Sequence, residues 1–306
     1  MSTEVSDGLH VDEIECHHDL QDFLCRLEDD PCLFQAERLQ ERLIALDTLD
    51  AEFGDFNSEA SATRTDSRIR GRAKALRIRL EAANAELYEF VRSEIVRGGK
   101  PDSLHQWLRN PTSQHESGSP SPGLGFDWRD ELVSGVLQFR EPGELDRYGL
   151  PEMFPFQPTP ARHVLDLIDA SLLSEDDVFV DLGSGLGHVP LLLSMLTGVQ
   201  SVGVEVQAAY VDSAQECARS LRLSRARFVA ADARAADFSS GTVFYLYSPF
   251  KGSILTDVLS MLHRENMRRS IKICSLGPCT SKVANETWLK TSSRPSTGRI
   301  AVFSSR

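Results

Sequence analysis

The segment from Val178 to Leu192, "VFVDLGSGLGHVPLL", constrains the fold of this chain more than any other stretch. A short apolar run leads into three closely spaced glycines, and a second apolar run follows them. Valine and phenylalanine favour a buried strand, and glycine permits a tight turn in which the backbone approaches a ligand. The free N–H groups at the start of a following helix face the same point. We therefore predict a strand, a ligand-holding loop and a helix.

Short apolar runs and helical runs alternate from Asp177 onward. The expected strands cover residues 178–183, 201–206, 227–232, 243–248 and 271–276. Helices are expected between them at 188–198, 208–223 and 253–266. This alternation is typical of a parallel sheet covered on both faces, and the tail after Thr287 reads as two strands joined by a Pro/Ser/Gly turn. The predicted fold class is therefore α/β: a doubly wound, mostly parallel seven-stranded sheet with a terminal antiparallel hairpin, preceded by a helical N-terminal region.

Composition divides the chain into four parts. Residues 1–18 are expected to be a disordered acidic tail, and residues 19–109 a helical region that is interrupted at Pro31. Residues 110–125 are rich in Pro, Ser and Gly, which indicates a linker. The sheet-containing domain takes up residues 126–306, with its core at 150–306.

One segment of the helical region carries a heptad-like stripe. Between residues 67 and 97 the apolar side chains alternate steps of four and three, at Ile69, Ala73, Leu76, Leu80, Ala83, Leu87 and Phe90. About three heptads are short for an independent coiled coil. Packing against the helices of residues 19–50 is therefore favoured, and self-association through residues 67–97 is the alternative.

The net charge of −12 is unevenly distributed. Residues 1–60 hold 17 acidic and 3 basic residues, a net of −14, so the remainder carries +2 and can meet an anionic substrate locally. A basic run at residues 64–79 could follow the phosphates of a nucleic acid. No aromatic residues interleave with it, so we favour pairing with the acidic N-terminal segment and do not expect a nucleic-acid partner.

Several features bear on location and metal binding. No apolar run is long enough to span a membrane, and the acidic N-terminus lacks the apolar core of a secretory signal. The six scattered cysteines suit a reducing compartment, so a cytoplasmic protein is expected. The "ECHH" stretch at 15–18, with Cys25 and Cys32, has irregular spacing, and no metal site is predicted.

The chemistry of the glycine loop separates three kinds of ligand. A nucleoside-triphosphate loop needs Lys and Ser/Thr after its glycines, but His188 and Val189 stand there. A dinucleotide loop, G-x-G-x-x-G, would place its third glycine at position 188. The loop instead reads D-x-G-x-G-x-G, with Asp181, Gly183, Ser184, Gly185 and Gly187. A carboxylate in the loop repels the negative charge of a pyrophosphate and attracts a ligand with a cationic amino-acid end.

This pattern resembles motif I of the class I S-adenosylmethionine-dependent methyltransferases. The resemblance covers residues 150–306 and looks closest to bacterial methyltransferase-domain proteins. It implies that Glu205, 18 residues after Gly187, binds both ribose hydroxyls of S-adenosyl-L-methionine. It also implies that Asp232 and the backbone of Ala233 bind the adenine, and that "QPTP" with Thr159 helps to cover the cofactor. Thr159 is separately expected to cap the helix that follows, because threonine suits a helix cap and Pro160 suits a first helical turn. The loop is similar as well to histone-lysine methyltransferases that use this fold, but their substrate motifs are not visible here.

The segment "YSPF" occupies the place of the motif that faces the transferable methyl group in this family. It departs from the N/D/S-P-P-Y/F pattern of amine methyltransferases, with either Tyr247 or Ser248 at the polar position, followed by Pro249 and Phe250. These four residues are the predicted catalytic segment for an unidentified acceptor, a small molecule or a protein. Tyr245 and Tyr247 alternate in the strand and should face the same side. His188 is either a general base or, as we favour, a residue packed against the loop.

Two other functions are kept as alternatives. The first is a nicotinamide-dependent oxidoreductase, which the glycine spacing and the terminal hairpin disfavour. The second is a cofactor-binding protein without turnover that acts through its helical stripe, which the imperfect "YSPF" motif keeps open.

Overall fold

The computed structural model describes residues 20–54, 64–98, 101–109, 125–142 and 152–305. The expected acidic tail at 1–18 and nearly all of the expected linker at 110–125 lie outside these ranges. Contacts divide the chain into two compact units, and the boundary falls inside helix α3 (Arg64–Val96), between Glu89 and Phe90. The end of α3 and helix α4 (Asp102–Arg109) thus belong to the unit that holds the sheet.

The first unit is helical, as predicted, and its chain breaks at Pro31. Residues 20–28 form a helix, and the 3₁₀ turns η1 (Pro31–Phe34) and η2 (Ala36–Arg38) lead into α2 (Leu39–Phe53). The carboxylate of Asp30 accepts the Cys32 N–H at 2.9 Å and so caps the first turn. The helices bury one shared apolar cluster, which comprises Leu24, Leu33, Ala45, Leu49, Ile69, Ala73, Leu76 and Leu80. Intramolecular packing of the first half of the stripe is confirmed.

The second half of the stripe departs from the heptad prediction. After Leu80 the buried positions are Asn84, Leu87, Val91 and Ile95, whereas Ala83 is only half-buried and Phe90 is 50% exposed. A helix keeps a strict seven-residue pattern on one face only if it supercoils, because a straight helix has 3.6 residues per turn. The buried face of α3 follows the straight-helix period.

Arg42 is a fully buried cation inside the first unit. Its guanidinium donates to the Asn84 carboxamide at 2.6 Å, to the Leu33 carbonyl at 3.0 Å and to the Gln35 carbonyl. These contacts join α2, the 3₁₀ turns and α3.

Part of the basic run on α3 pairs with acidic residues of the same unit. Arg72 binds Glu28, and Arg77 binds Asp50 at 3.0 Å. Both acids lie within residues 1–60, which supports the predicted intramolecular pairing.

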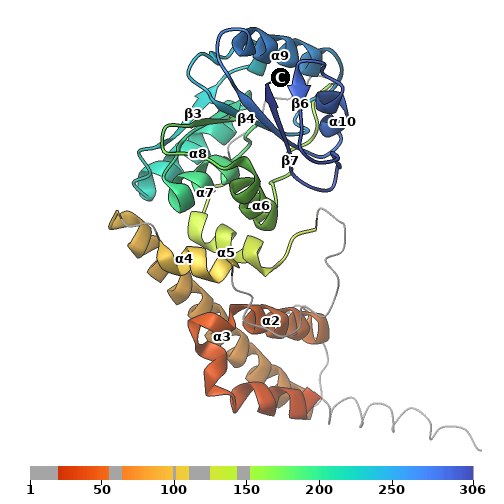
Figure 1. Ribbon diagram of the computed structural model, residues 1–306. Helices are drawn as coiled ribbons and strands as arrows, with labels where there is room; N and C mark the ends of the chain where they lie inside the picture. Colours follow the sequence, from red (N-terminus) through yellow and green to blue (C-terminus); the bar gives the residue numbers. More distant parts are fainter. Residues whose placement is uncertain (1–19, 55–63, 99–100, 110–124, 143–151, 306) are drawn as a thin grey trace, which may run out of the picture. The chain divides into compact units, whose positions relative to one another are not determined.

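The second unit is built on a seven-stranded sheet with the order β3-β2-β1-β4-β5-β7-β6 (Figure 1). The strands are β1 (Val178–Leu182), β2 (Gln200–Glu205), β3 (Ala226–Ala230), β4 (Val243–Tyr247), β5 (Lys272–Leu276), β6 (Leu289–Lys290) and β7 (Ala301–Ser305). The first five are parallel, and β7 pairs antiparallel with both β5 and β6. The predicted fold class, including the terminal hairpin, is confirmed.

Helices cover both faces of this sheet (Figure 1). They are α6 (Ala161–Ser171), α7 (His188–Thr197), α8 (Ala208–Ser220), α9 (Gly252–Asn266) and α10 (Cys279–Ala284), and α5 (Trp128–Leu137) packs against α6. The apolar residues of α9 share one core with β1, β4 and β5, and this core includes Leu246, Val258, Leu262 and Ile273. Within the described ranges, no helix is long and apolar enough to cross a membrane.

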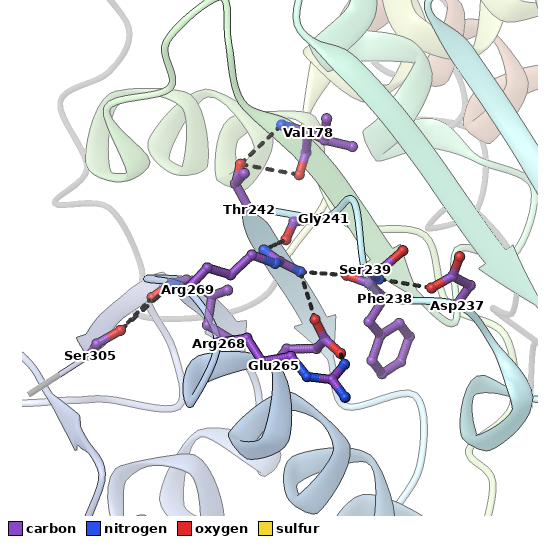
Figure 2. Close-up of polar contacts among 11 residues, drawn as sticks. Val178, Asp237, Phe238, Ser239, Gly241, Thr242, Glu265, Arg268, Arg269 and Ser305 are labelled. Carbon is purple, nitrogen blue, oxygen red and sulfur yellow. Dashed lines mark hydrogen bonds and ion pairs between the residues drawn. The ribbon is translucent and has the colours of Figure 1, made fainter.

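Polar contacts close the amino-terminal edge of the parallel strands. The Arg269 guanidinium, just after α9, donates to the carbonyls of Phe238 and Gly241 and pairs with Glu265 at 3.3 Å (Figure 2). Thr242 accepts the Val178 N–H at 3.0 Å on the same edge (Figure 2). The carboxyl-terminal edge, where the strand order reverses between β1 and β4, is where ligands bind in open α/β sheets.

Candidate functional site

The glycine loop between β1 and α7 requires its three glycines for both conformation and space. Gly183, Gly185 and Gly187 have φ values of +84°, +53° and +84°. A Cβ would lie 2.2 Å from the Pro249 Cβ at Gly183, 2.2 Å from the Phe156 ring at Gly185 and 2.4 Å from the Phe228 ring at Gly187. The glycines therefore bring the loop against the segment after β4 and against Phe156.

Glu205, at the end of β2, holds this loop in place. Its side chain is nearly buried, and its Oε2 accepts the Gly185 N–H at 2.9 Å while its Oε1 accepts the Gln207 N–H at 2.9 Å. The Val204 carbonyl also accepts the N–H groups of Gly183 and Ser184, at 2.8 and 3.1 Å. A carboxylate has about four lone-pair sites, so Glu205 keeps capacity for two ligand hydroxyls.

Asp181 lies in β1 between Gly203 of β2 and Tyr245 of β4, and only 4% of it is exposed. Burial raises the pKa of this carboxyl well above its usual range, and the nearby Glu205 carboxylate raises the pKa further. A buried acid of this kind is stabilised in its ionised form by a neighbouring cation.

Asp232 has local partners of its own. It caps the 3₁₀ turn η3 (Ala233–Ala235), where its Oδ1 accepts the Arg234 N–H at 2.8 Å. Its carboxylate also pairs with the Arg234 guanidinium at 2.6 Å, which lowers the pKa of Asp232. Asp232 and Ala233 nevertheless line the cavity described below.

Tyr247 and Ser248, the two polar residues of "YSPF", have different environments at the end of β4. Ser248 has a φ of +42°, and its hydroxyl donates to the Leu276 carbonyl at 3.2 Å and accepts the Cys279 N–H at 3.0 Å. This hydroxyl is engaged by the β5–α10 connection, and a role of Ser248 toward the acceptor stays a prediction. Tyr247, Pro249 and Phe250 line the cavity with it.

Tyr247 and Tyr245 differ in environment. The Tyr247 hydroxyl is buried and has no hydrogen-bond partner among the residues that the structure describes. Tyr245 is 0% exposed, does not line the cavity and lies 3.3 Å, oxygen to oxygen, from the Thr159 hydroxyl. Of the two tyrosines, Tyr247 is the one that reaches the site.

The predicted role of Thr159 as a helix cap is wrong. Helix α6 begins at Ala161, and its cap residue is Pro160, without a side-chain hydrogen bond. The Ala161 N–H instead donates to the Asp130 carboxylate at 2.8 Å, and the same carboxylate accepts the Asp127 N–H of α5. Asp130 serves two helix starts, because the two helices meet there.

Residues 152–157 cover the site, and the sequence analysis missed most of them. Met153 and Phe250 form an antiparallel bridge, and the Phe154 N–H donates to the Pro249 carbonyl at 3.2 Å. The Glu152 carboxylate accepts the Ile254 N–H at 3.0 Å and the Ser253 hydroxyl at 2.8 Å. Helix α9 has no side-chain cap of its own, so Glu152 caps it from 102 residues away.

His188 is a packed residue, as favoured above. Its ring lies 4.6 Å from that of Phe139 and 6.3 Å from that of Phe156. Burial lowers the pKa of His188 to about 4. Its Nδ1 is buried without a partner in the described part of the chain. The neutral ring is part of the wall behind the loop.

These elements enclose a cavity of about 930 Å³ at the carboxyl edge of β1–β4. This volume is near the upper end of the roughly 300–1,000 Å³ typical of ligand pockets. Its lining includes the predicted residues Gly183, Glu205, Asp232, Ala233, Tyr247, Ser248, Pro249 and Phe250. It also includes the unpredicted residues Met153, Phe154, Phe156, Gln207 and Tyr210. Phe154 and Phe156 are 42% and 39% exposed, and such "FPF" aromatics before the first helix were the missed signal.

One family model matches part of the sheet-containing unit. Residues 153–281 match the family described as histone methylation protein DOT1, which is less than half of the chain. No curated protein matches significantly.

Many solved structures resemble the chain. An RNA methyltransferase from Salinibacter ruber, in complex with S-adenosyl-L-homocysteine, is 22% identical over 48% of this chain and 92% of that chain, with a TM-score of 0.40. The putative methyltransferase yhhF from Escherichia coli is 17% identical over 51% of this chain and 91% of that chain, with a TM-score of 0.39. A Pyrococcus abyssi tRNA (uracil-54, C5)-methyltransferase is 17% identical over 53% and 44%, with a TM-score of 0.37.

Proposed function

We propose that this chain, which carries a class I S-adenosylmethionine-dependent methyltransferase domain, methylates an acceptor held beside Tyr247, Pro249 and Phe250. One observation carries the proposal: one cavity is lined by residues at the ends of β2, β3 and β4 and by Gly183 of the glycine loop. Glu205, Asp232 and the segment after β4 thereby face the same hollow.

The described residues fit this cofactor. Glu205 is fixed by two backbone N–H groups and has lone pairs left for the two ribose hydroxyls. Asp232 and Ala233 are placed for the adenine, with Arg234 orienting the Asp232 carboxylate. The Asp181 carboxyl lies in β1 directly before the glycine loop and does not line the cavity, and a cationic amino-acid end bound at the loop would favour its ionised form.

Catalysis on this scaffold rests on positioning. When bound, S-adenosylmethionine supplies a methyl group whose bond to sulfur breaks as the bond to the acceptor forms, and the acceptor loses its proton to solvent. Burial raises the pKa of Tyr247, so its hydroxyl stays protonated near neutral pH and acts as a hydrogen-bond donor. Phe154 and Phe156 line the cavity and exclude water from the reacting groups. Aligning the reactants can remove roughly 7–11 kcal/mol of the barrier.

Calorimetric titration of the full chain with S-adenosylmethionine, S-adenosylhomocysteine and NAD tests the cofactor site. We expect micromolar binding of the first two, and at least a tenfold loss in Asp181→Asn and in Glu205→Gln. Asp237→Asn is the matched control, because the Asp237 carboxylate accepts the Ser239 N–H and belongs neither to the D-x-G-x-G-x-G motif nor to the lining of the cavity. Binding of NAD alone, or wild-type affinity in both site variants, would refute the proposal.

The sheet topology bears on one of the two alternative functions, and the other needs an experiment. The oxidoreductase is disfavoured by the sheet, because dinucleotide-binding folds have the order 3-2-1-4-5-6, whereas β7 here inserts antiparallel beside β5. A label-transfer experiment distinguishes a methyltransferase from a cofactor-binding protein without turnover. Methyl-labelled cofactor should label an extract fraction with the wild type and not with Glu205→Gln.

We further propose a cytoplasmic bacterial protein whose acceptor is a small molecule or protein. The absence of aromatic residues within the basic run at residues 64–79 supports an acceptor other than nucleic acid. Self-association through residues 67–97 stays a proposal, which light scattering of the full chain tests. The internal packing of Ile69, Ala73, Leu76 and Leu80 favours a monomeric helical unit.

A further inference from the structure

A second hollow adjoins the cofactor cavity. Its volume is about 340 Å³, and three of its wall residues, Phe154, Phe250 and Pro278, also line the larger cavity. The two spaces therefore meet at the segment that faces the transferable methyl group. A volume near the lower end of the roughly 300–1,000 Å³ range suits a small molecule.

The walls of this hollow are apolar, and its charges are all positive. Phe154, Phe250, Leu255 and Pro278 form the apolar surface, and the charged residues that line it are Lys251 and Lys282. The two lysines come from different elements, since Lys251 precedes α9 and Lys282 lies in α10.

The neighbouring acids leave this positive character in place. Neither Glu152 nor Glu286 lines the hollow, and the Glu152 carboxylate is directed at the start of α9, where it accepts the Ile254 N–H and the Ser253 hydroxyl. Glu286 lies 4.0 Å from the Lys282 Nζ, at the limit of an ion pair. The Lys251 Nζ lies 5.4 Å from the centre of the Phe154 ring, which holds it over the wall that the two spaces share.

We propose that this hollow is the acceptor subsite and that the acceptor is a small aromatic carboxylate. Its ring lies between Phe154 and Phe250, its carboxylate meets Lys251 and Lys282, and its nucleophilic end points toward the cofactor cavity. The proposal rests on the methyltransferase function above and specifies its substrate class. A protonated lysine side chain, the acceptor of the histone-lysine methyltransferases that the glycine loop resembles, would be repelled by the two lysines.

A matched pair of probes tests the charge preference. Full-length protein, with and without saturating S-adenosylhomocysteine, is titrated by ligand-detected NMR with 3-phenylpropanoate and with 3-phenylpropylamine, which share one carbon skeleton. We expect the acid to bind, the amine to bind at least tenfold more weakly, and S-adenosylhomocysteine to leave acid binding in place.

Variants locate the carboxylate. Lys251→Met and Lys282→Met should each weaken acid binding about two- to fivefold, as expected for partly exposed ion pairs, and the double variant about tenfold. Lys290→Met is the control, because Lys290 lines neither cavity. Calorimetry with S-adenosylhomocysteine should give wild-type affinity in all three single variants.

Several results would overturn the acceptor proposal. They are equal or tighter binding of the amine, unchanged acid binding in the double variant, or displacement of the acid by S-adenosylhomocysteine. The last result would place the acid in the cofactor cavity. Failure of the wild type to bind S-adenosylhomocysteine would instead overturn the proposed function, whichever probe the hollow prefers, so the two failures are distinguishable.

Discussion

Replacing single glycines of the loop by alanine should separate the role of the fold from that of the site. Gly187 has a φ of +84°, and an added Cβ would lie 2.4 and 2.6 Å from atoms of the Phe228 ring and 3.2 Å from the Ala214 Cβ. The left-handed conformation costs an alanine about 1–2 kcal/mol. Overpacking against the buried Phe228 adds about 1–3 kcal/mol. Gly187→Ala should therefore lower the free energy of unfolding by about 2–5 kcal/mol.

Gly185→Ala meets a different neighbour. Its Cβ would clash with the Phe156 ring, which is 39% exposed and can turn outward into solvent. The stability cost should then be close to the backbone cost alone, about 1–2 kcal/mol. Turning Phe156 outward removes part of the cavity cover and its contact with Tyr210 at 5.1 Å. We expect at least a tenfold loss of affinity for S-adenosylhomocysteine.

Gly98→Ala supplies the matched control in the same unit. Its φ is +87°, and nothing lies within 4 Å of an added Cβ, so it measures the backbone cost without a clash. Thermal unfolding followed by circular dichroism should show a decrease of Tm by roughly 5–15 °C for Gly187→Ala and by roughly 2–8 °C for the other two. A Gly187→Ala variant with the same Tm as the Gly98→Ala variant, or a Gly185→Ala variant with full affinity for S-adenosylhomocysteine, would contradict the packing argument.

Two further predictions concern buried polar groups. His188 has a pKa of about 4 in the folded chain and about 6.5 when unfolded, so only the unfolded chain gains its proton between these values. The free energy of unfolding should therefore fall by up to roughly 3 kcal/mol as the pH drops from about 6.5 to 4. In urea titrations at several pH values, His188→Phe should lack this dependence on pH. The same pH dependence in the variant and the wild type would refute the prediction. Arg42→Met leaves the Asn84 oxygen and two carbonyls without their donor and should destabilise the first unit by about 2–4 kcal/mol. Hydrogen exchange over residues 39–53 measures this loss of stability, with Arg26→Met as the control. Exchange as slow in Arg42→Met as in the wild type would exclude the stabilising role of Arg42.

Contacts between distant segments set the hydrogen bonds of short polar side chains in this chain. Thr159 was expected to cap α6, but Asp130 from the preceding helix takes that place. The β5–α10 connection engages the Ser248 hydroxyl, and the sequence around Ser248 does not indicate this contact. Short polar side chains accept whichever donor the fold brings near, and their neighbours in sequence do not specify it.

The sequence by itself determined the sheet, its terminal hairpin, the glycine loop and the position of Glu205, because strand periodicity, glycine spacing and a carboxylate ending an apolar strand are local signals. Only the tertiary structure decided that Glu152 caps α9 and that Phe156 closes over Gly185. It alone decided that Lys251 and Lys282 border one hollow. Each of these depends on the close approach of segments far apart in the chain, and the packing of the whole domain sets that approach.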